Sequence, residues 1–457
     1  MSNYNPFKKP ISKLEAKDLE VLKDISEGWY IEYKSSLPKN DKIAKSITSF
    51  ANTLGGWLFY GVKEKESDSR EAGEFCGIDN PEEAEVHVRE AIVYYSNPEA
   101  FFETKIIYGG CDEIGLPDNK AVLVIYIPQS NSLPHIHGSG RVYRRISDSS
   151  EPMVEKDRSR LDAMWEQKRN NHEKLKEFLN TAPLQSSAES PILHLFLMTD
   201  PLGTRGHRSS MSFDVFNEVI KSTPFIFDNF YSGPNRFVAR CTKGNDVNSD
   251  LLTWQYFANG TSVVSIPLNV CNLCNNNYDA NKSFLDGYEW GEHFLNLLDT
   301  NGLNQGKIID LNQLVMLFQH ILTIHSGLLL KDEIQGQLFI KVISKNMNKA
   351  IPFIDFESFI DFILKCGVPL PLHDDWIFPE GKDINLFYTH KDGLNFEGGT
   401  LDYINAITLF TSMMNCFALP ATSLFKEGET VKEASIRLVQ EFSEIFKRSP
   451  RTTIIND

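Results

Sequence analysis

The sequence predicts an α/β front domain with a mixed sheet, followed by an α+β C-terminal domain. Up to about residue 146, short apolar stretches typical of strands alternate with stretches whose apolar residues recur at helical spacing. Beyond residue 191, several strands come first and most helices follow, as in an α+β domain. Charged and polar residues between the two predict a connecting helix and a linker. We therefore expect domains at residues 10–150 and 191–457, joined through residues 151–190.

The front domain is expected to begin with a helix that leads into a short strand. Apolar residues spaced along one face predict the helix at residues 14–26. The alternation at residues 29–34 predicts the strand, on which Glu32 and Lys34 point to one face. An acid and a lysine that project together are unusual there, because Glu and Lys are depleted in strands.

A second helix and a second strand are predicted to complete this central stretch. The helix covers residues 43–52, a Gly-Gly pair turns the chain, and a strand apolar on both faces covers residues 57–62. Glu64 follows this strand. Because open α/β sheets bind ligands at their strand ends, we expect Glu64 to lie near Glu27 and Glu32.

The remaining elements are predicted from the same patterns. In the front domain they are a helix at 81–95 and strands at 103–108, 121–127 and 141–146. In the C-terminal domain the strands are 192–198, 236–242, 335–344 and a hairpin of 251–258 with 261–268 around Asn259-Gly260. The helices there are 290–298, 311–324, 356–365, 401–417 and 431–446.

The net charge of −15 argues against a surface that binds nucleic acid everywhere, so any such surface is local. Two groups of cations are candidates: Lys34, Lys39, Lys42 and Lys45 near the carboxylates, and Arg141, Arg144 and Arg145 at the end of the front domain. The alternative is that these charges form an ordinary solvated face.

The sequence also indicates the cellular compartment of the protein. The N-terminus has no apolar signal segment, and the apolar run at 406–425 is broken by polar residues and a proline, so we expect no membrane span. Seven cysteines, an odd number, are typical of reduced thiols in a cytoplasmic protein.

Three further groups of residues are weaker candidates for a functional site than the carboxylates. Cys271 and Cys274 have the spacing of half a zinc site, but no second pair completes it. His135 and His137 have ligand-like spacing, and structure or substrate contact is favoured over metal. A Gly-rich loop with Arg205, His207 and Arg208 is more simply a solvated loop than an anion site. No Gly-x-x-x-x-Gly-Lys-Ser/Thr loop supports ATP binding.

Several motifs in the first third of the chain carry a family resemblance. Glu27 is followed after four residues by Glu32-Tyr33-Lys34, then by Phe-Ala-Asn-Thr-x-Gly-Gly at 50–56 and a Gly-Val strand end at 61–62. A strand ending in proline at 122–128, Pro134-His135 and Val-Tyr-Arg-Arg at 142–145 follow in order. In this order of motifs, residues 10–150 resemble the Schlafen-type AlbA_2 domain.

The resemblance implies a function as well as a fold. In nuclease members, three carboxylates form a metal-dependent RNA-cutting site, and the matching residues here are Glu27, Glu32 and Glu64. Hard oxygen ligands of this kind suit Mg²⁺ or Mn²⁺. Lys34 would neutralise charge that develops on the phosphate. The third carboxylate is aspartate in animal Schlafens, so Glu64 departs from their pattern.

We therefore expect a metal-dependent endoribonuclease that cuts structured RNA, with tRNA as the favoured RNA and DNA as a further candidate partner. An antiviral effector with a C-terminal sensing domain is one form of this expectation. The alternative function is a non-catalytic DNA- or RNA-binding regulator. A purely structural explanation of the same residues is a buried Glu32–Lys34 salt bridge with Glu27 as a helix cap. Animal Schlafens clamp RNA between two similar lobes, and this chain has one, so we expect a homodimer or a higher oligomer.

Overall fold

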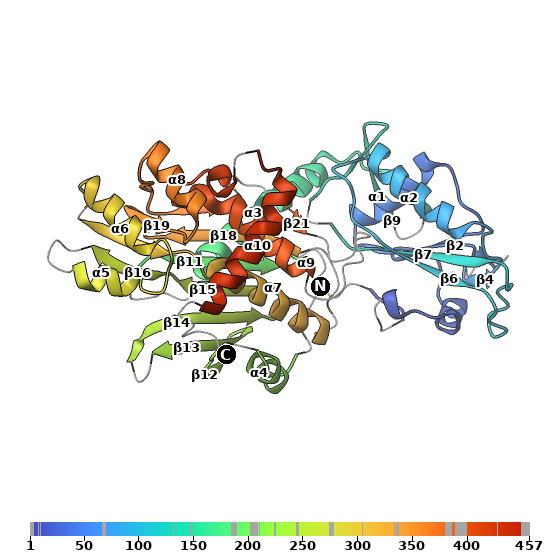
Figure 1. The fold of residues 1–457 in the computed structure, drawn as a ribbon. Helices are drawn as coiled ribbons and strands as arrows, with labels where there is room; N and C mark the ends of the chain where they lie inside the picture. Colours follow the sequence, from blue (N-terminus) through green and yellow to red (C-terminus); the bar gives the residue numbers. More distant parts are fainter. Residues whose placement is uncertain are drawn as a thin grey trace. The chain divides into compact units, whose positions relative to one another are not determined.

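The computed structural model describes residues 4–448, except for residues 8, 10, 66–69, 131, 147–148, 184–189, 202–208, 210, 224, 244–245, 274–277, 304, 333, 335–337, 380–385, 389–399 and 427. The chain divides into two compact units at residues 177 and 178. Figure 1 shows the elements of both units, coloured along the sequence.

The front unit is built on a four-stranded sheet of β1 (Ile31–Lys34), β2 (Gly56–Tyr60), β7 (Ala121–Ile127) and β6 (Glu103–Tyr108), in that order. β1 pairs with β2 in parallel, whereas the other two pairings are antiparallel, so the predicted mixed sheet is confirmed. The register sets Glu32 opposite Leu58 and Lys34 opposite Tyr60.

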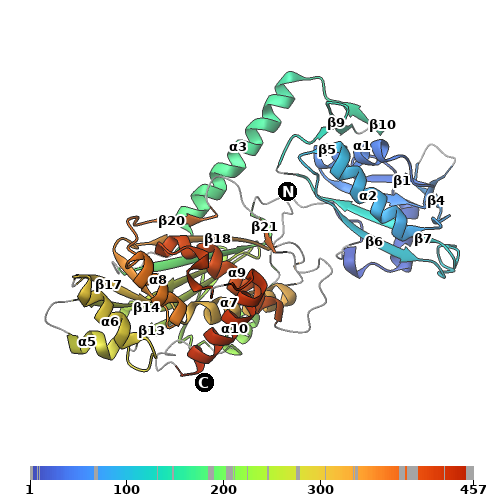
Figure 2. The ribbon, with the colours of Figure 1, turned by 45° about the horizontal axis from the view of Figure 1, so that its top comes forward.

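The two faces of this sheet are covered differently. One face carries Tyr33, Trp57 and Phe59, which pack with the short 3₁₀ helices η1 (Ile11–Lys13) and η2 (Ala16–Asp24). The other face is covered by α1 (Asn40–Ala51) and α2 (Pro81–Tyr95), as Figure 2 shows. Glu32 is on this second face, as the alternation predicted, because it contacts Ser46 of α1. The helix predicted at 14–26 is thus the 3₁₀ helix η2 at 16–24, and η1 precedes the predicted range.

A smaller sheet closes the front unit against α1. Its strands are β10 (Ser149–Val154), β9 (Arg141–Ile146), β8 (Ile136–His137) and β5 (Ser96–Asn97), and each neighbouring pair is antiparallel. The connecting helix predicted from residue 151 is therefore wrong at its start, because β10 extends the sheet and α3 begins at Arg158 (Arg158–Thr181). A two-stranded ribbon, β3 (Lys63–Glu64) with β4 (Ala72–Glu74), follows β2.

The C-terminal unit contains an eight-stranded sheet and a three-stranded one. The first comprises β12 (Asn229–Gly233), β13 (Arg236–Lys243), β14 (Asp246–Phe257), β15 (Ser262–Pro267), β11 (Ile192–Met198), β18 (Leu338–Lys345), β20 (Trp376–Phe378) and β21 (Leu386–Tyr388). The second comprises β16 (Asn269–Leu273), β17 (Gly306–Asp310) and β19 (Ala350–Phe353). β14 and β15 form the predicted hairpin, with Gly260 at φ +78° in its turn.

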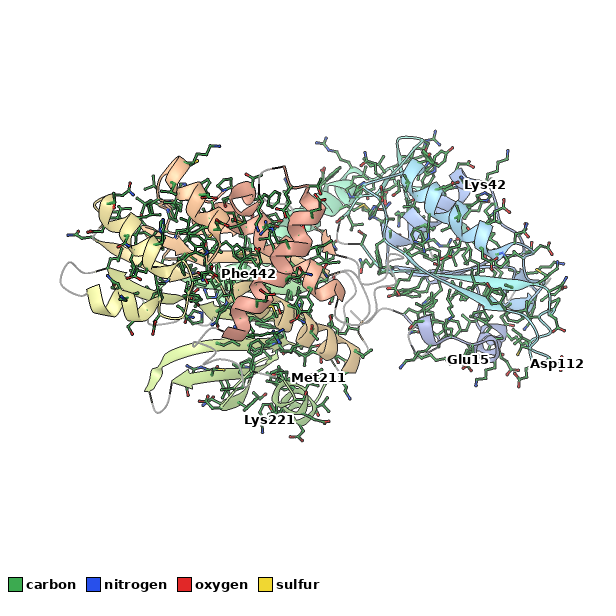
Figure 3. The ribbon with its side chains drawn as sticks, viewed as in Figure 1. Glu15, Lys42, Asp112, Met211, Lys221 and Phe442 are labelled. Atoms are coloured by element: carbon green, nitrogen blue, oxygen red, sulfur yellow. The ribbon has the colours of Figure 1, made fainter. Side chains whose placement is uncertain are left out.

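Helices complete this unit around one apolar core. They are α4 (Phe213–Lys221), α5 (Tyr278–Phe284), α6 (Gly291–Thr300), α7 (Leu314–Lys331), α8 (Glu357–Cys366), α9 (Thr400–Met413) and α10 (Val431–Arg448), with η3 (Met414–Phe417) and η4 (Ala421–Leu424). Phe442 of α10 lies inside the unit (Figure 3) and is fully buried. The sequence prediction missed several short elements here, among them β16, β17 and β19.

One described helix, α7, is long and apolar enough to cross a membrane, judged by length and composition only. A core helix meets the same criteria, and 56% of the apolar stretch in α7 is buried inside the unit.

Candidate functional site

Glu27 is a buried carboxylate with one oxygen left without a partner. Its backbone N–H donates to the Arg70 carbonyl at 2.9 Å, which fixes the residue just before β1. Oε1 accepts the Tyr33 N–H at 2.5 Å. Oε2 is buried and has no hydrogen-bond partner in the described part of the chain. An unpartnered buried acceptor is costly, so this oxygen is a natural point of attachment for a cation.

The protonation of Glu27 reflects this environment. Burial raises the pKa of the Glu27 carboxyl to about 7, although Lys34 and the Tyr33 N–H oppose the rise. The negative charges of Glu64 and Glu32 raise this pKa further. The carboxyl is therefore shared between its protonated and ionised forms near neutral pH, and a nearby cation would favour the ionised form.

Glu32 lies on β1, and both of its oxygens are occupied. The carboxylate is 1% exposed. Oε1 accepts from Ser46 Oγ at 3.0 Å, and Oε2 accepts from Arg145 Nη1 at 2.7 Å. Its negative charge is therefore balanced within the protein interior.

Lys34 lies between the two glutamates. Its Nζ is 3.3 Å from Glu32 Oε1 and 3.8 Å from Glu27 Oε1, and it donates to the Tyr33 carbonyl at 3.0 Å. The side chain is 37% exposed, whereas those of the two glutamates are almost fully buried. The ammonium group of Lys34 thus lies close to the carboxyl groups of both buried glutamates and is also accessible to solvent.

Arg145 is the residue that the sequence prediction placed wrongly. It was expected to contact nucleic acid, but its side chain is fully buried. The guanidinium donates to Glu32 and to the Gly28 carbonyl at 2.8 Å, and it lies 4.5 Å from the centre of the Phe50 ring. Its position on β9 directs it inward, because β9 packs on α1.

The Phe-Ala-Asn-Thr-x-Gly-Gly motif holds Arg145 in place. Thr53 Oγ1 accepts the Arg145 N–H at 2.9 Å, while Phe50 supplies the ring beneath the guanidinium. Asn52 donates to the carbonyls of His135 and Tyr143 at 2.9 and 3.0 Å. A Cβ on Gly56 would lie 2.5 Å from the Phe50 ring, so glycine is required there. The motif therefore joins α1 to the smaller sheet.

The other predicted cations fall into two groups. Lys39, Lys42 and Arg141 are exposed and form no ion pair with described residues; Lys42 is labelled at the surface in Figure 3. Lys45 lies 3.7 Å from Glu151, and Arg144 forms an ion pair with the buried Glu155. The first group is free to attract phosphates, whereas the second is partly neutralised.

Glu64 lies on β3 and is half-buried. Its charge is close enough to raise the pKa of Glu27. Among the residues that the structure describes, no three His, Cys, Asp or Glu side chains are grouped so that they could hold a metal ion. Glu27 and Glu64 thus interact through their charges, whereas both oxygens of Glu32 are bound by Ser46 and Arg145.

The weaker candidates fit structural roles or lie outside the description. His135 and His137 are buried, and His137 binds the Asp41 carbonyl and Ser139 Oγ. Cys271 is partly buried on β16, and six described cysteines are free thiols. Cys274 and the loop with Arg205, His207 and Arg208 fall outside the described residues.

Comparisons with known proteins agree with the motif order. Residues 27–154 match the model of the family described as Schlafen, AlbA_2. This match begins at Glu27 and ends at the last residue of β10. No curated protein matches the chain.

Two solved structures are similar over the same part of the chain. One is titled the N-terminal domain of a "Putative ATP-dependent DNA Helicase RecG-related Protein" from Nitrosomonas europaea. It has 23% identity, covers 32% of this chain and 97% of that chain, and has a TM-score of 0.23. The other is the DIP2311 protein from Corynebacterium diphtheriae: 21% identity, 32% of this chain, 26% of that chain and a TM-score of 0.20. The match thus spans about a quarter of the second protein.

Proposed function

Because residues 27–154 form a Schlafen AlbA_2 domain, we propose that the chain is a metal-dependent endoribonuclease that cuts structured RNA, with tRNA as the favoured substrate. The observation that carries this proposal is Glu27, whose Oε2 is buried without a partner beside a half-exposed lysine. A purely structural salt bridge leaves no reason for an unpaired buried oxygen next to solvent-facing charge.

Mg²⁺ or Mn²⁺ suits the acidic pair. Mg²⁺ is commonly bound through one or two carboxylates together with substrate phosphates, so a group of three ligands is not required. We assign Glu27 and Glu64 to hold the ion, because Glu27 Oε2 has no partner and Glu64 is half-buried nearby. Glu32, which the sequence placed among the ligands, has both oxygens bound by Ser46 and Arg145, so we assign it to position Lys34. When bound, the metal would supply Lewis-acid activation of the phosphate and of water.

The chain's own residues orient the substrate. Lys34 Nζ, held 3.3 Å from Glu32, would donate to a phosphate oxygen and offset the charge that develops there. Its carboxylate partner is fixed by Arg145, so the lysine is presented at one position. Lys39, Lys42 and Arg141 would supply local positive potential in a chain whose net charge is −15.

A second candidate is a non-catalytic DNA- or RNA-binding regulator. The buried pair of Glu32 with Arg145 favours it, because that pair gives Glu32 a structural role without catalysis. In this case Lys34, Lys39 and Lys42 would contact phosphates and nothing would be cut.

The remaining expectations stay part of the proposal. We place the protein in the cytoplasm, with residues 191–457 as a sensing, partner-binding or substrate-binding domain of an antiviral defence effector. RNA would be bound across two front domains of a homodimer or a higher oligomer, because a single front domain offers few cations near the carboxylates in a chain whose net charge is −15.

The test is to incubate purified protein with total RNA, with and without Mn²⁺. Wild-type protein should fragment RNA only with the metal, and Glu27→Gln should abolish fragmentation. Glu90→Gln, at an exposed position of α2, is the matched control and should cut normally. RNA binding without any fragmentation would support the regulator and contradict the nuclease.

A further inference from the structure

We propose that a hollow at the C-terminal end of α2 binds one unpaired nucleobase of the RNA. This inference rests on the proposed function, since it places the substrate of the same site. The hollow has a volume of about 530 Å³ and is lined by residues from α2, β5 and β8, among them Tyr94, Tyr95, Asn97, Glu99 and His137. This volume is in the range of small-molecule sites. Figure 2 shows β5 beside α2.

The inner wall of the hollow is a fixed aromatic surface. The rings of Tyr95 and His137 stack with centroids 5.8 Å apart and planes 17° apart. His137 is held on both ring nitrogens, by Ser139 Oγ at 2.9 Å and by the Asp41 carbonyl at 3.0 Å. A Cβ on Gly138 would lie 2.9 Å from the Tyr95 ring, and the Gly138 N–H donates to the Tyr95 carbonyl. The wall is therefore rigid before any ligand arrives.

The outer side of the hollow presents an aromatic ring to solvent. Tyr94 is 75% exposed, and it has no ring partner among the described residues. The adjacent Val93 is 59% exposed. Aromatic rings in this state are suited to stack on bases, because every base has an apolar face. Asn97 and Glu99 add polar groups able to bind the amino edge of a base.

The hollow is connected to the carboxylate site through α1. His137 contacts Asp41 in the first turn of α1, and Ser46 in the next turn contacts Glu32. At 1.5 Å per residue, Asp41 and Ser46 are separated by roughly 7.5 Å along the helix axis. The hollow and the carboxylate site are therefore both anchored on α1.

Two exposed cations lie next to residues that contact or pair with His137. Lys42 follows Asp41 on α1, and Arg141 pairs with His137 across β8 and β9. Both are exposed and form no ion pair with described residues. A polyanion is therefore favoured over a second copy of the chain, whose net charge is −15.

Binding is tested with a short, labelled, single-stranded oligoribonucleotide in the absence of divalent metal, so that no cleavage occurs. Tyr94→Ala should weaken binding by about five- to hundredfold, the loss typical of one stacked base, while Tyr94→Trp should bind as well as wild type. Tyr108→Ala removes another exposed tyrosine of the same unit and should leave affinity unchanged.

A scan of single abasic sites along the oligonucleotide makes the test specific. One position should weaken wild-type binding, and the same position should have no further effect in Tyr94→Ala. Equal affinity of Tyr94→Ala and wild type overturns the inference, as does a change of oligomeric state by light scattering without a change in affinity. Cleavage of total RNA is measured separately, so failure of this inference and failure of the nuclease proposal are distinguished.

Discussion

Arg145 donates to Glu32 across 2.7 Å, and neither side chain reaches solvent. A buried ion pair of this kind contributes little net stability when intact, but it is costly to break from one side, because the remaining charge stays buried. The pair joins β9 to β1, and Lys34 adds a second positive charge to Glu32. The arrangement of Lys34 therefore depends on a residue on another sheet.

Replacing Arg145 by methionine should destabilise the front unit by about 3–5 kcal/mol, because Glu32 loses its main partner in the interior. Arg145→Lys should recover little of this loss, since a lysine has no planar fork to reach both Glu32 and the Gly28 carbonyl. Urea denaturation measures the effect. Arg141→Met, on the same strand but exposed, is the control and should change stability only slightly.

The stability of the front unit should fall as the pH rises from about 4.5 to about 7. The folded-state pKa of Glu27 is raised to about 7, whereas the unfolded carboxyl ionises near its ordinary value, so folding retains a proton in this range. The loss amounts to about 3 kcal/mol at pH 8. Glu27→Gln should remove this pH dependence and stabilise the unit at pH 8. A Glu27→Gln protein that is no more stable than wild type at pH 8 would contradict the buried, uncompensated charge.

Lys34 should affect the turnover rate of cleavage, whereas Lys39 should affect the binding of the RNA substrate. Lys34→Ala should lower kcat by about 10²–10³, because a fixed charge near the phosphate is lost. Lys39→Ala, at an exposed position, should raise KM with little change in kcat. Steady-state kinetics on one RNA substrate separate the two effects. A change in KM alone for Lys34→Ala would assign that lysine to binding.

The carboxylate of Glu64 should be required for cleavage, and the length of its side chain should matter less than its charge. We expect Glu64→Gln to abolish cleavage and Glu64→Asp to retain part of it, since aspartate keeps a carboxylate for the metal. Mn²⁺ titration of both variants provides the measurement. Normal cleavage by Glu64→Gln would transfer the role to another acid, such as Glu66 or Asp68, which lie outside the described residues.

The C-terminal unit should lose stability in acid through His194. Burial lowers the pKa of His194 to about 4, and Lys345 contributes to this effect. The folded state therefore disfavours the proton that the unfolded chain accepts near pH 6.5, so stability is complete above that pH and falls as the pH decreases towards 4, by about 3 kcal/mol. His194→Gln should flatten this fall while keeping a polar contact with Ser265. An unchanged acid midpoint would contradict the prediction.

The sequence predicted elements well where local pattern decided them. α2, β6, β7, β9 and β11 have the expected bounds, because each is a regular stretch between turn residues. It failed at β10, where the charged residues after Glu151 favour a helix and pairing with β9 overrides that preference.

Within the candidate site, the sequence predicted that Glu32 and Lys34 share a face of β1, but not how their charges are paired. The alternation of β1 placed Glu32 and Lys34 on one face, as observed. The inward direction of Arg145 depends on the packing of β9 on α1, a contact between segments far apart in the sequence. The alternation of β9 did offer one signal, since Tyr143 and Arg145 fall on the same face and Tyr143 is buried.

The distance along the chain between Glu32 and Arg145, 113 residues, has a consequence for biosynthesis. Domains fold as units while translation proceeds from the N-terminus. β1, Lys34 and α1 leave the ribosome long before β9, so the carboxylate of Glu32 has no guanidinium to bind during that interval. The geometry of Lys34 is completed only once residue 145 has emerged, so the Glu32–Arg145 pair forms late in the synthesis of the front unit.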